Sequence, residues 1–184
     1  MTWQLVPLAG AAAQAWRNGG GLTRELLAWP SPDAWQVRIS VADVTAAGPF
    51  STFEGIERWF AVLEGAGVVL RVDGVAKTLV AGDAPFHFSG EARVDCALVD
   101  GSTRDFNLMA PPGRSRLHRV AGERAFRLQG EMLAAVYAHG RPAAVRTADS
   151  VIEVPAGHLA WCRRQWAASG TVTGADALWM EIEG

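Results

Sequence analysis

Hydrophobic and polar residues alternate along much of the chain. In the segment WQVRISVADV, every second residue from Trp35 to Val41 is apolar and the residues between them are polar, as in a β-strand with two different faces. The segments RWFAVLEG, VVLRVDGVAKTLV, VDCALVD, LAAVYA and ALWMEIE continue this theme, and Asp73-Gly74 is a two-residue hairpin signal. Helical periodicity is confined mainly to LAGAAAQAW, residues 8–16. We therefore expect a mainly β protein with few short helices.

Two segments, residues 62–88 and 136–162, resemble each other. Each contains a glycine, an expected hairpin, a second glycine 17 residues after the first, and then a strand that begins with aromatic residues. With a shift of 75 residues, the matched pairs are Gly65 with Gly140, Arg71 with Arg146, Gly82 with Gly157, and Phe86 with Trp161. The repeat predicts two related β-barrels packed together. We expect the first over residues 1–112 and a second, degenerate barrel over residues 113–184, with strand exchange between them as an option.

Composition restricts the classes of function. The 184 residues carry a formal net charge of −2 and no run of basic residues, which argues against a partner that is a nucleic acid or an anionic membrane. Lys77 is the only lysine, so nearly all positive charge is arginine, whose planar fork suits carboxylates. Cys96 and Cys162 lie in apolar runs and are expected to be small buried hydrophobes. The start of the chain lacks the pattern of a signal peptide, and no window is apolar enough to span a bilayer, so a cytoplasmic protein is expected.

The order of strands and glycine turns resembles the cupin layout. Cupin enzymes hold a metal with two histidines in an HxH arrangement, a glutamate and a distant histidine, but the corresponding segment here, GPFSTFEGIERWFAVLEG, contains no histidine. The four histidines, His87, His118, His139 and His158, are scattered, whereas an imidazole site needs convergent ligands. We therefore expect neither a bound metal nor a cofactor.

Three segments are similar to the HutD/Ves family: WRNGGGLTREL at residues 16–26, WQVRISVADVTAAGPFSTFEGIERWFAVLEGAG at residues 35–67, and DFNLM at residues 105–109. The resemblance extends over essentially the whole chain. It implies a bicupin, that is, two cupin-like barrels without the usual metal, and a regulatory role in histidine utilisation with a small carboxylate as the ligand. No enzymatic reaction comes with the resemblance.

Arg58 is the first candidate for the binding site. It begins the expected strand RWFAVLE and alternates with Phe60, so its guanidinium shares a face with apolar side chains. A buried guanidinium is costly unless it meets a carboxylate, which could come from a ligand or from Glu57, Glu54 or Asp43. The family resemblance favours a ligand, and a bidentate arginine–carboxylate pair is strong and selective.

The motif WRNGGGLTREL adds further polar groups. Its three glycines can adopt positive φ and bring backbone N–H groups close to a ligand or to another strand. Asn18 supplies an amide, Thr23 a hydroxyl and Arg24 a second cation. A phosphate-binding loop is disfavoured because no GxGxxG or P-loop lysine pattern is present. The alternative is a tight bend between strands, with Arg24 paired to Glu25 or to another surface acid.

Asn107 lies in DFNLM and shares a strand face with Asp105 and Met109. Its amide could recognise an amide or formyl group of a ligand, since it both donates and accepts hydrogen bonds. The alternative is an amide that only caps a turn.

These observations predict a protein that binds a small anionic metabolite in its N-terminal barrel. Arg58 would hold the carboxylate, and Asn18, Thr23, Arg24 and Asn107 would add polar contacts. By resemblance, the protein would sense or buffer an intermediate of histidine breakdown such as urocanate or formylglutamate. A homodimer is expected only by analogy with other cupins.

Two other classes of function stay open. The first is a metal-independent cupin enzyme that acts on a small acid, with Asp43 or Glu57 transferring a proton. No nucleophile with a pairable base is evident in the sequence, so no catalytic residue is assigned and a binding protein is favoured. The second is a protein-interaction module, which predicts a large exposed apolar patch and no small-molecule pocket.

Overall fold

Strands make up almost all of the regular structure. The computed structural model describes residues 2–165 and 167–184. Within these residues the only helices are two short 3-10 turns, η1 (Leu8–Gly10) and η2 (Pro32–Ala34). The expected mainly β fold with few short helices is therefore confirmed. In the same part of the chain, no helix is long and apolar enough to cross a membrane.

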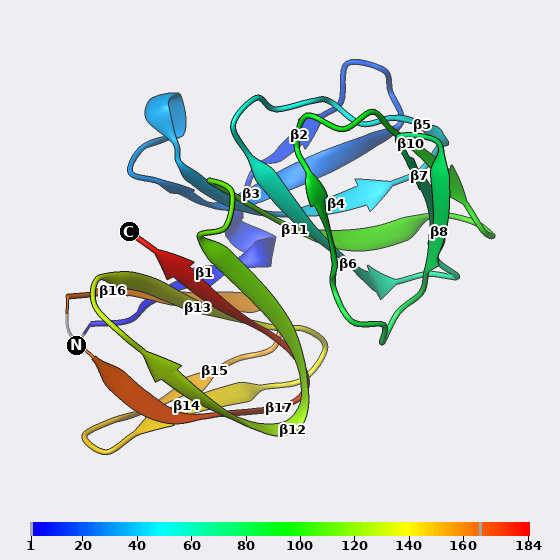
Figure 1. Ribbon diagram of the computed structural model, residues 1–184. Coiled ribbons are helices and arrows are strands. Elements are labelled where there is room, and N and C mark those ends of the chain that lie inside the picture. Colours follow the sequence, from blue (N-terminus) through cyan, green and yellow to red (C-terminus); the bar gives the residue numbers. More distant parts are fainter. Residues whose placement is uncertain (1, 166) are drawn as a thin grey trace. The chain divides into compact units, whose positions relative to one another are not determined.

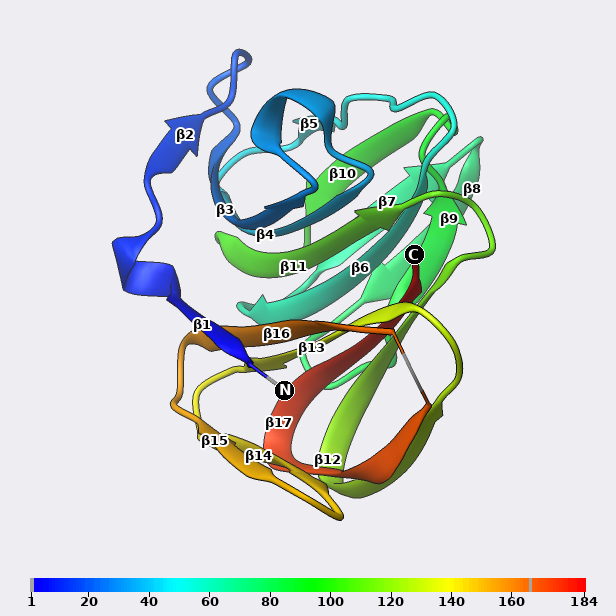
Figure 2. The ribbon, with the colours of Figure 1, turned by 90° about the vertical axis from the view of Figure 1, so that its left-hand side faces the viewer.

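The chain folds into two compact units. The first unit comprises residues 11–113, and the second unit comprises residues 1–10 together with residues 114–184. The break near residue 113 lies beside the expected boundary, but the first ten residues belong to the second unit rather than the first. The reason is strand pairing, because β1 (Gln4–Pro7) runs antiparallel to β16 (His158–Arg164), as Figure 2 shows.

The first unit contains two antiparallel sheets (Figure 1). The larger sheet has the strand order β2-β3-β4-β11-β6-β9, and the smaller has the order β5-β10-β7-β8. The strands are β2 (Ala13–Ala15), β3 (Gly21–Trp29), β4 (Val37–Val44), β5 (Gly48–Pro49), β6 (Glu57–Glu64), β7 (Val68–Val72), β8 (Val75–Leu79), β9 (Phe86–Ser89), β10 (Val94–Leu98) and β11 (Thr103–Ala110).

Apolar side chains from both sheets form one core in the first unit. Val44 and Phe60 come from the larger sheet, and Leu70 and Cys96 come from the smaller one. The alternating pattern produces this arrangement, because every second residue of β4 and β6 turns toward the opposite sheet. The opposite face of β4 is buried as well, since Ile39 is fully buried. Both faces of this strand are therefore covered by protein.

The second unit contains one sheet with the order β1-β16-β13-β17-β14-β15, in which β12 also pairs with β17. Its core includes Trp179 stacked on Phe126, with ring centroids 4.6 Å apart. The remaining strands are β12 (Ser115–Leu128), β13 (Met132–Ala138), β14 (Ala143–Thr147), β15 (Val151–Val154) and β17 (Ala168–Glu183).

The repeat seen in the sequence corresponds to a pair of equivalent hairpins. In β7–β8, Val68 pairs with Leu79, and 75 residues later in β14–β15, Ala143 pairs with Val154. All four side chains are buried in the core of their own unit. The four matched glycines have positive φ in both copies: Gly65, Gly82, Gly140 and Gly157. The Asp73-Gly74 hairpin is also present, since Val72 pairs with Val75 across it.

Asp105 is a buried carboxyl group inside the first unit. Its side chain is fully buried, Oδ2 accepts a hydrogen bond of 2.8 Å from the Thr103 hydroxyl, and Oδ1 has no partner among the described residues. Burial raises the pKa of Asp105 to about 7; the Thr103 hydrogen bond opposes this shift and the charge of Asp43 adds to it. The folded protein therefore holds a proton here at a pH where the unfolded chain has released it.

This proton predicts a pH-dependent stability. Because the pKa is raised in the folded state, the free energy of unfolding should fall as pH rises from about 4 toward 7, by up to about 1.4 kcal/mol per pH unit. Asp105→Asn keeps an acceptor for Thr103 but cannot ionise, so its stability should depend less on pH and exceed that of the wild type at pH 8. Urea unfolding between pH 5 and 8 measures both, with Asp100→Asn on an exposed turn as the control. An unchanged slope for Asp105→Asn would contradict the assignment.

Candidate functional site

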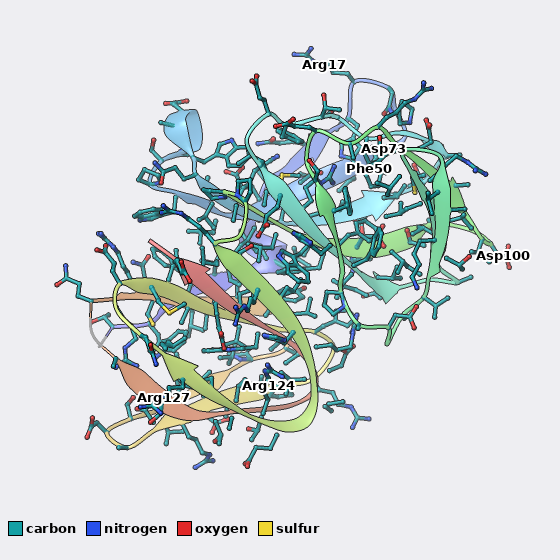
Figure 3. All side chains as sticks on the ribbon, viewed as in Figure 1. Arg17, Phe50, Asp73, Asp100, Arg124 and Arg127 are labelled. Atoms are coloured by element: carbon teal, nitrogen blue, oxygen red, sulfur yellow. The ribbon has the colours of Figure 1, made fainter. Side chains whose placement is uncertain are left out.

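The first unit contains a cavity of about 700 Å³ that is open to solvent on one side. Its walls come from β2 and the turn that follows it, from β3, β4, β6 and β11, and from the segment after β5. The lining residues are Gln14, Ala15, Trp16, Arg17, Asn18, Thr23, Arg38, Ser40, Ala42, Val44, Pro49, Phe50, Ser51, Phe53, Arg58, Phe60, Asn107 and Met109. Figure 3 shows Arg17 on the outer turn and Phe50 within the unit.

The cavity wall is organised in rows that cross neighbouring strands. In one row, Met109 of β11 pairs with Arg38 of β4 on one side and with Arg58 of β6 on the other. In the adjacent row, Asn107 pairs with Ser40. All five residues line the cavity. Since side chains two residues apart on a strand share a face, the three strands present both rows to the same space.

Arg58 is a buried guanidinium without a carboxylate partner. The residue is only 6% exposed, and none of the described aspartate or glutamate side chains forms an ion pair with it. Its Nη2 donates to Asn107 Oδ1 at 2.8 Å and its Nη1 donates to the Ser51 carbonyl at 3.4 Å. Nε is buried and has no hydrogen-bond partner in the described chain. The internal ion pair that the sequence left open, with Glu54, Glu57 or Asp43, is therefore not formed.

Arg58 remains charged at neutral pH in spite of its surroundings. Burial, with a smaller contribution from the charge of Arg38, lowers the pKa of Arg58 to about 10. Three aromatic rings surround the guanidinium: its central carbon lies 5.0 Å from the ring centroid of Phe50, 5.3 Å from Phe88 and 6.0 Å from Phe53. The negative faces of aromatic rings offset part of the cost of burying a cation. They leave its unused N–H donor unsatisfied.

Arg38 shows how an arginine behaves when the chain does supply a partner. Its Nε donates to Glu25 Oε2 at 2.7 Å, and its guanidinium lies 6.0 Å from the ring centroid of Trp35. Arg38 and Arg58 both line the cavity, and only the charge of Arg38 is balanced in this way. The cavity wall is therefore positive at its Arg58 end.

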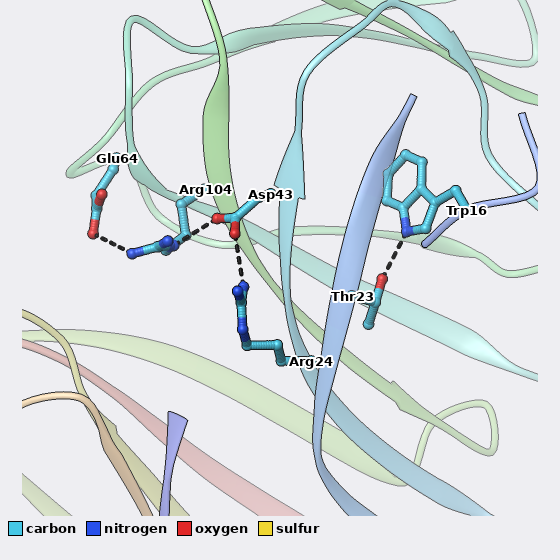
Figure 4. Close-up of polar contacts among 6 residues, drawn as sticks. All are labelled: Trp16, Thr23, Arg24, Asp43, Glu64 and Arg104. Atoms are coloured by element: carbon cyan, nitrogen blue, oxygen red, sulfur yellow. Dashed lines mark hydrogen bonds and ion pairs between the residues drawn. The ribbon is translucent and has the colours of Figure 1, made fainter. Parts of the chain in front are cut away.

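Asn18 and Thr23 line the same cavity, but both make hydrogen bonds within the chain. Asn18 Oδ1 accepts from the backbone N–H of Gly20 at 3.0 Å, and Thr23 Oγ1 accepts from the indole N–H of Trp16 at 2.8 Å (Figure 4). Both keep donors to offer, the amide of Asn18 and the hydroxyl proton of Thr23. Binding of a ligand by these groups stays a prediction.

Arg24 lies outside the cavity lining. Its Nη1 pairs with Asp43 Oδ2 at 2.8 Å, Asp43 Oδ1 accepts from Arg104 at 2.7 Å, and Arg104 also reaches Glu64 at 3.3 Å (Figure 4). Burial raises the pKa of Asp43, but the hydrogen bonds and charges of Arg104 and Arg24 outweigh burial and leave this pKa below its usual value. Arg24 is therefore paired with an acidic residue of the chain, which was the alternative to ligand binding.

Strand geometry explains why Arg24 separates from Thr23. Thr23 pairs with Ala42, which lines the cavity, whereas Arg24 pairs with Val41, which does not. Adjacent residues of one strand point to opposite faces, so Arg24 points away from the face on which Thr23 lines the cavity. The adjacency of the two residues in the sequence already contained this constraint.

The described residues that line the cavity include no aspartate, glutamate, histidine, cysteine, lysine or tyrosine that could transfer a proton. Among the residues that the structure describes, its titratable side chains are Arg17, Arg38 and Arg58. Asp43 belongs to the ion-pair network above, and Glu57 Oε2 lies 3.0 Å from His87 Nε2 while it accepts from the Gly113 N–H at 2.8 Å. No three His, Cys, Asp or Glu side chains in the described residues are placed to hold a metal ion.

Arg38, Arg17 and Gln14 line the cavity although their sequence context did not predict a role in the site. The signal for Arg38 was present, since it shares the polar face of WQVRISVADV with Ser40. That face lines the cavity, and Ser40 is only 4% exposed. The contact between Asn107 and Arg58 joins residues far apart in the chain, so it required the pairing of β6 with β11.

Two relatives by sequence are informative. The chain is 45% identical over 104 residues to an uncharacterized 21.2 kDa protein in the hutC 3′ region of Pseudomonas putida, covering 55% of this chain and 54% of that protein. It is 34% identical over 112 residues to protein Ves of Cronobacter sakazakii, covering 60% of this chain and 62% of that protein. The match thus spans between half and two thirds of the length of these relatives.

Solved structures match over the full length. A conserved protein of unknown function from Pseudomonas aeruginosa PAO1 has a TM-score of 0.85 at 30% identity, covering 100% of both chains. HutD from Pseudomonas fluorescens SBW25, in a formate condition, has a TM-score of 0.84 at 28% identity, covering 99% of this chain and 98% of that one. The nickel complex of the bacterial pirin YhhW from Escherichia coli, with a TM-score of 0.68 at 11% identity, shows the shared fold alone. The expected cupin-like β fold is confirmed by these neighbours.

The HutD family model matches residues 9–180, which is nearly the whole chain and includes all three motifs noted in the sequence. The chain therefore belongs to the HutD family.

Proposed function

We propose that the protein is a non-catalytic binding protein for a small carboxylate, which Arg58 holds in the cavity of the first unit. The observation that carries the proposal is a buried, charged guanidinium that lines a cavity, has an unused N–H donor and has no acidic partner among the described residues. An isolated buried charge is costly, and a carboxylate that enters the cavity would remove this cost through charge-assisted hydrogen bonds.

In this proposal the main role of Asn107 is to orient the guanidinium of Arg58. Its carbonyl oxygen holds Nη2 and fixes the plane of the guanidinium, while its amide N–H₂ remains available to an acceptor on the ligand. Asn18, in the turn after β2, would provide a further polar contact, while the Thr23 hydroxyl already accepts from the Trp16 indole. Arg24 is left out because Asp43 already satisfies it.

A cavity whose titratable residues are arginines supports binding rather than catalysis. The enzyme alternative needs a proton donor or acceptor within hydrogen-bond reach of the substrate, and neither Asp43 nor Glu57 lines the cavity. A cavity with a buried cation also favours a small-molecule ligand over a protein-interaction module. The bicupin architecture, the cytoplasmic location and a homodimer stay predictions.

The relatives suggest where such a ligand would come from. One lies in the hutC 3′ region of P. putida, and the HutD structure from P. fluorescens was obtained in a formate condition, formate being the smallest carboxylate. We propose that the ligand is an intermediate of histidine breakdown such as urocanate or formylglutamate, and that the protein senses or buffers it.

Calorimetry with formate, benzoate, urocanate and formylglutamate tests the proposal, with formamide and benzamide as neutral controls. We expect saturable binding of at least one acid and none of the matched amides. NMR spectra of the same mixtures separate binding from turnover, because a new product would favour the enzyme. Absence of binding by all four acids would refute the proposal.

Arg58→Ala should weaken binding of the best acid by roughly 2 kcal/mol or more, which is about 30-fold, because the charge-assisted contact is lost. The fold should be retained, since no internal ion pair is broken. Arg71→Ala, which removes an exposed arginine outside the cavity, is the matched control and should leave calorimetric affinity unchanged. Equal affinities for Arg58→Ala and wild type would reject the contact.

Asn107→Asp should weaken the binding of anionic ligands by placing a negative charge beside Arg58. The new carboxylate would lie about where the amide oxygen now accepts from Arg58, and it would neutralise the guanidinium that an anionic ligand needs. We expect acid binding to fall about 30-fold or more while the thermal midpoint stays equal or rises. Asn107→Gln, which keeps a neutral amide, is the control. Full binding by Asn107→Asp would show that the ligand does not depend on an unpaired Arg58.

A further inference from the structure

The hairpin that forms one wall of the cavity is built from the edge of the larger sheet. β2 is three residues long, all three are exposed, and its described pairing is with β3 alone. Five consecutive residues from this hairpin line the cavity, from Gln14 to Asn18. A short edge strand with exposed backbone bonds belongs to the least stable part of a sheet. One side of the cavity is therefore much less firmly held than the other.

The β3 side of the hairpin turn is anchored, in contrast to Gly19 just before it. The Gly20 carbonyl accepts from the backbone N–H groups of Thr45 and Ala46, at 2.9 and 3.2 Å. A side chain at Gly21 would come within 2.5 Å of the Asp43 carbonyl, so only glycine permits this close approach. Gly19, at the tip, has φ of 71° and no neighbour within 4 Å of where a Cβ would lie. The glycine triplet thus joins the open Gly19 to the anchored start of β3.

A side-chain hydrogen bond connects Trp16, at the start of the turn, to β3. The Trp16 indole N–H donates to Thr23 Oγ1 at 2.8 Å, and the indole meets Phe50 edge-on with centroids 6.0 Å apart (Figure 4). Trp16, Thr23 and Phe50 all line the cavity. The indole therefore lies at the cavity wall, where the Thr23 hydroxyl, the Phe50 ring and the core of the unit hold it.

We propose that residues 14–19 form a movable cover over the cavity and that Thr23 is the positioning residue that holds it closed through Trp16. This inference rests on the proposed function, because it needs a ligand beneath the cover. A ligand that touches both Arg58 and the cover binds the closed state better than the open one and so shifts the population toward closure. Thr23 acts on the ligand through the indole rather than by direct contact.

Hydrogen–deuterium exchange reads the cover directly. The N–H groups of Trp16 and Gly19 are bonded within the hairpin, to the carbonyls of Gly21 and Trp16, so they report its opening. In the free protein we expect both to exchange at least tenfold faster than the amides of β4. Saturation with the best-binding acid of the calorimetric series should slow both, by about tenfold or more, with little change in β4. Exchange as slow as that of β4, or unaffected by a bound acid, would overturn the cover.

Thr23→Val and Thr23→Ser form a matched pair. Thr23→Val removes the acceptor at nearly constant shape and should speed exchange at Trp16 and Gly19 by about five- to tenfold, with a similar loss of acid affinity. Thr23→Ser keeps the acceptor and should behave like the wild type. Urea unfolding should be unchanged in both, which separates a loosened cover from a destabilised fold. Equal behaviour of the two variants would reject the role of the hydroxyl.

A double-mutant cycle separates positioning from direct contact. If Thr23 acts through the indole, Trp16→Phe combined with Thr23→Val should cost no more affinity than the larger single change. Additive losses would mean that Thr23 contacts the ligand itself, which overturns its positioning role while the proposed function stands. If no acid of the series binds, the proposed function and this inference fail together.

Discussion

The chemistry of the first unit depends on the positive charge of Arg58, which has no carboxylate partner among the described residues. Arg58 is buried and charged, but the chain gives it an amide oxygen and a carbonyl in place of a carboxylate. The same sheet pairs Arg38 with Glu25 and Arg24 with Asp43, so acidic partners are not scarce in this fold. An arginine that keeps its charge and lacks such a partner retains the capacity to bind an anion. The aromatic rings around Arg58 lower the free-energy cost of burying its charge, and they leave its N–H groups free to bind a ligand.

The larger sheet makes this arrangement precise. β4, β6 and β11 are neighbours, so residues distant in sequence fall into rows across the sheet, and two such rows place both arginines, Asn107 and Ser40 on one wall. Strands in the middle of a sheet are restrained on both sides, whereas β2 at the edge is restrained by β3 alone. The cavity thus combines a rigid wall that carries charge with a loosely held wall that carries an indole.

The sequence predicted much of this and missed what depends on pairing between strands. Alternation predicted the β fold, and Asp73-Gly74 predicted a hairpin. Arg58 shares a strand face with Phe60, which predicted that its side chain points inward. Alternation says which side of its own strand a residue occupies, but not which residue lies across from it. For that reason the sequence could not tell whether an acidic residue of the chain lies beside Arg58, and it gave no role to Arg38. Arg24 is different, because alternation along the strand already placed it on the opposite face from Thr23. The pairing of β1 with β16 left no local trace, since it joins the two ends of the sequence.

That pairing has a consequence for biosynthesis. The second unit is discontinuous: β1 emerges early from the ribosome, and β16, its partner, emerges only after the whole first unit has been made. Residues 11–113 are complete at that point and can collapse while the ribosome is still translating, since domains generally fold as units during synthesis. Until then the backbone N–H and C=O groups of β1 have no partner strand. The first unit is therefore expected to fold before the second, and β1 is expected to pair only after β16 has been made.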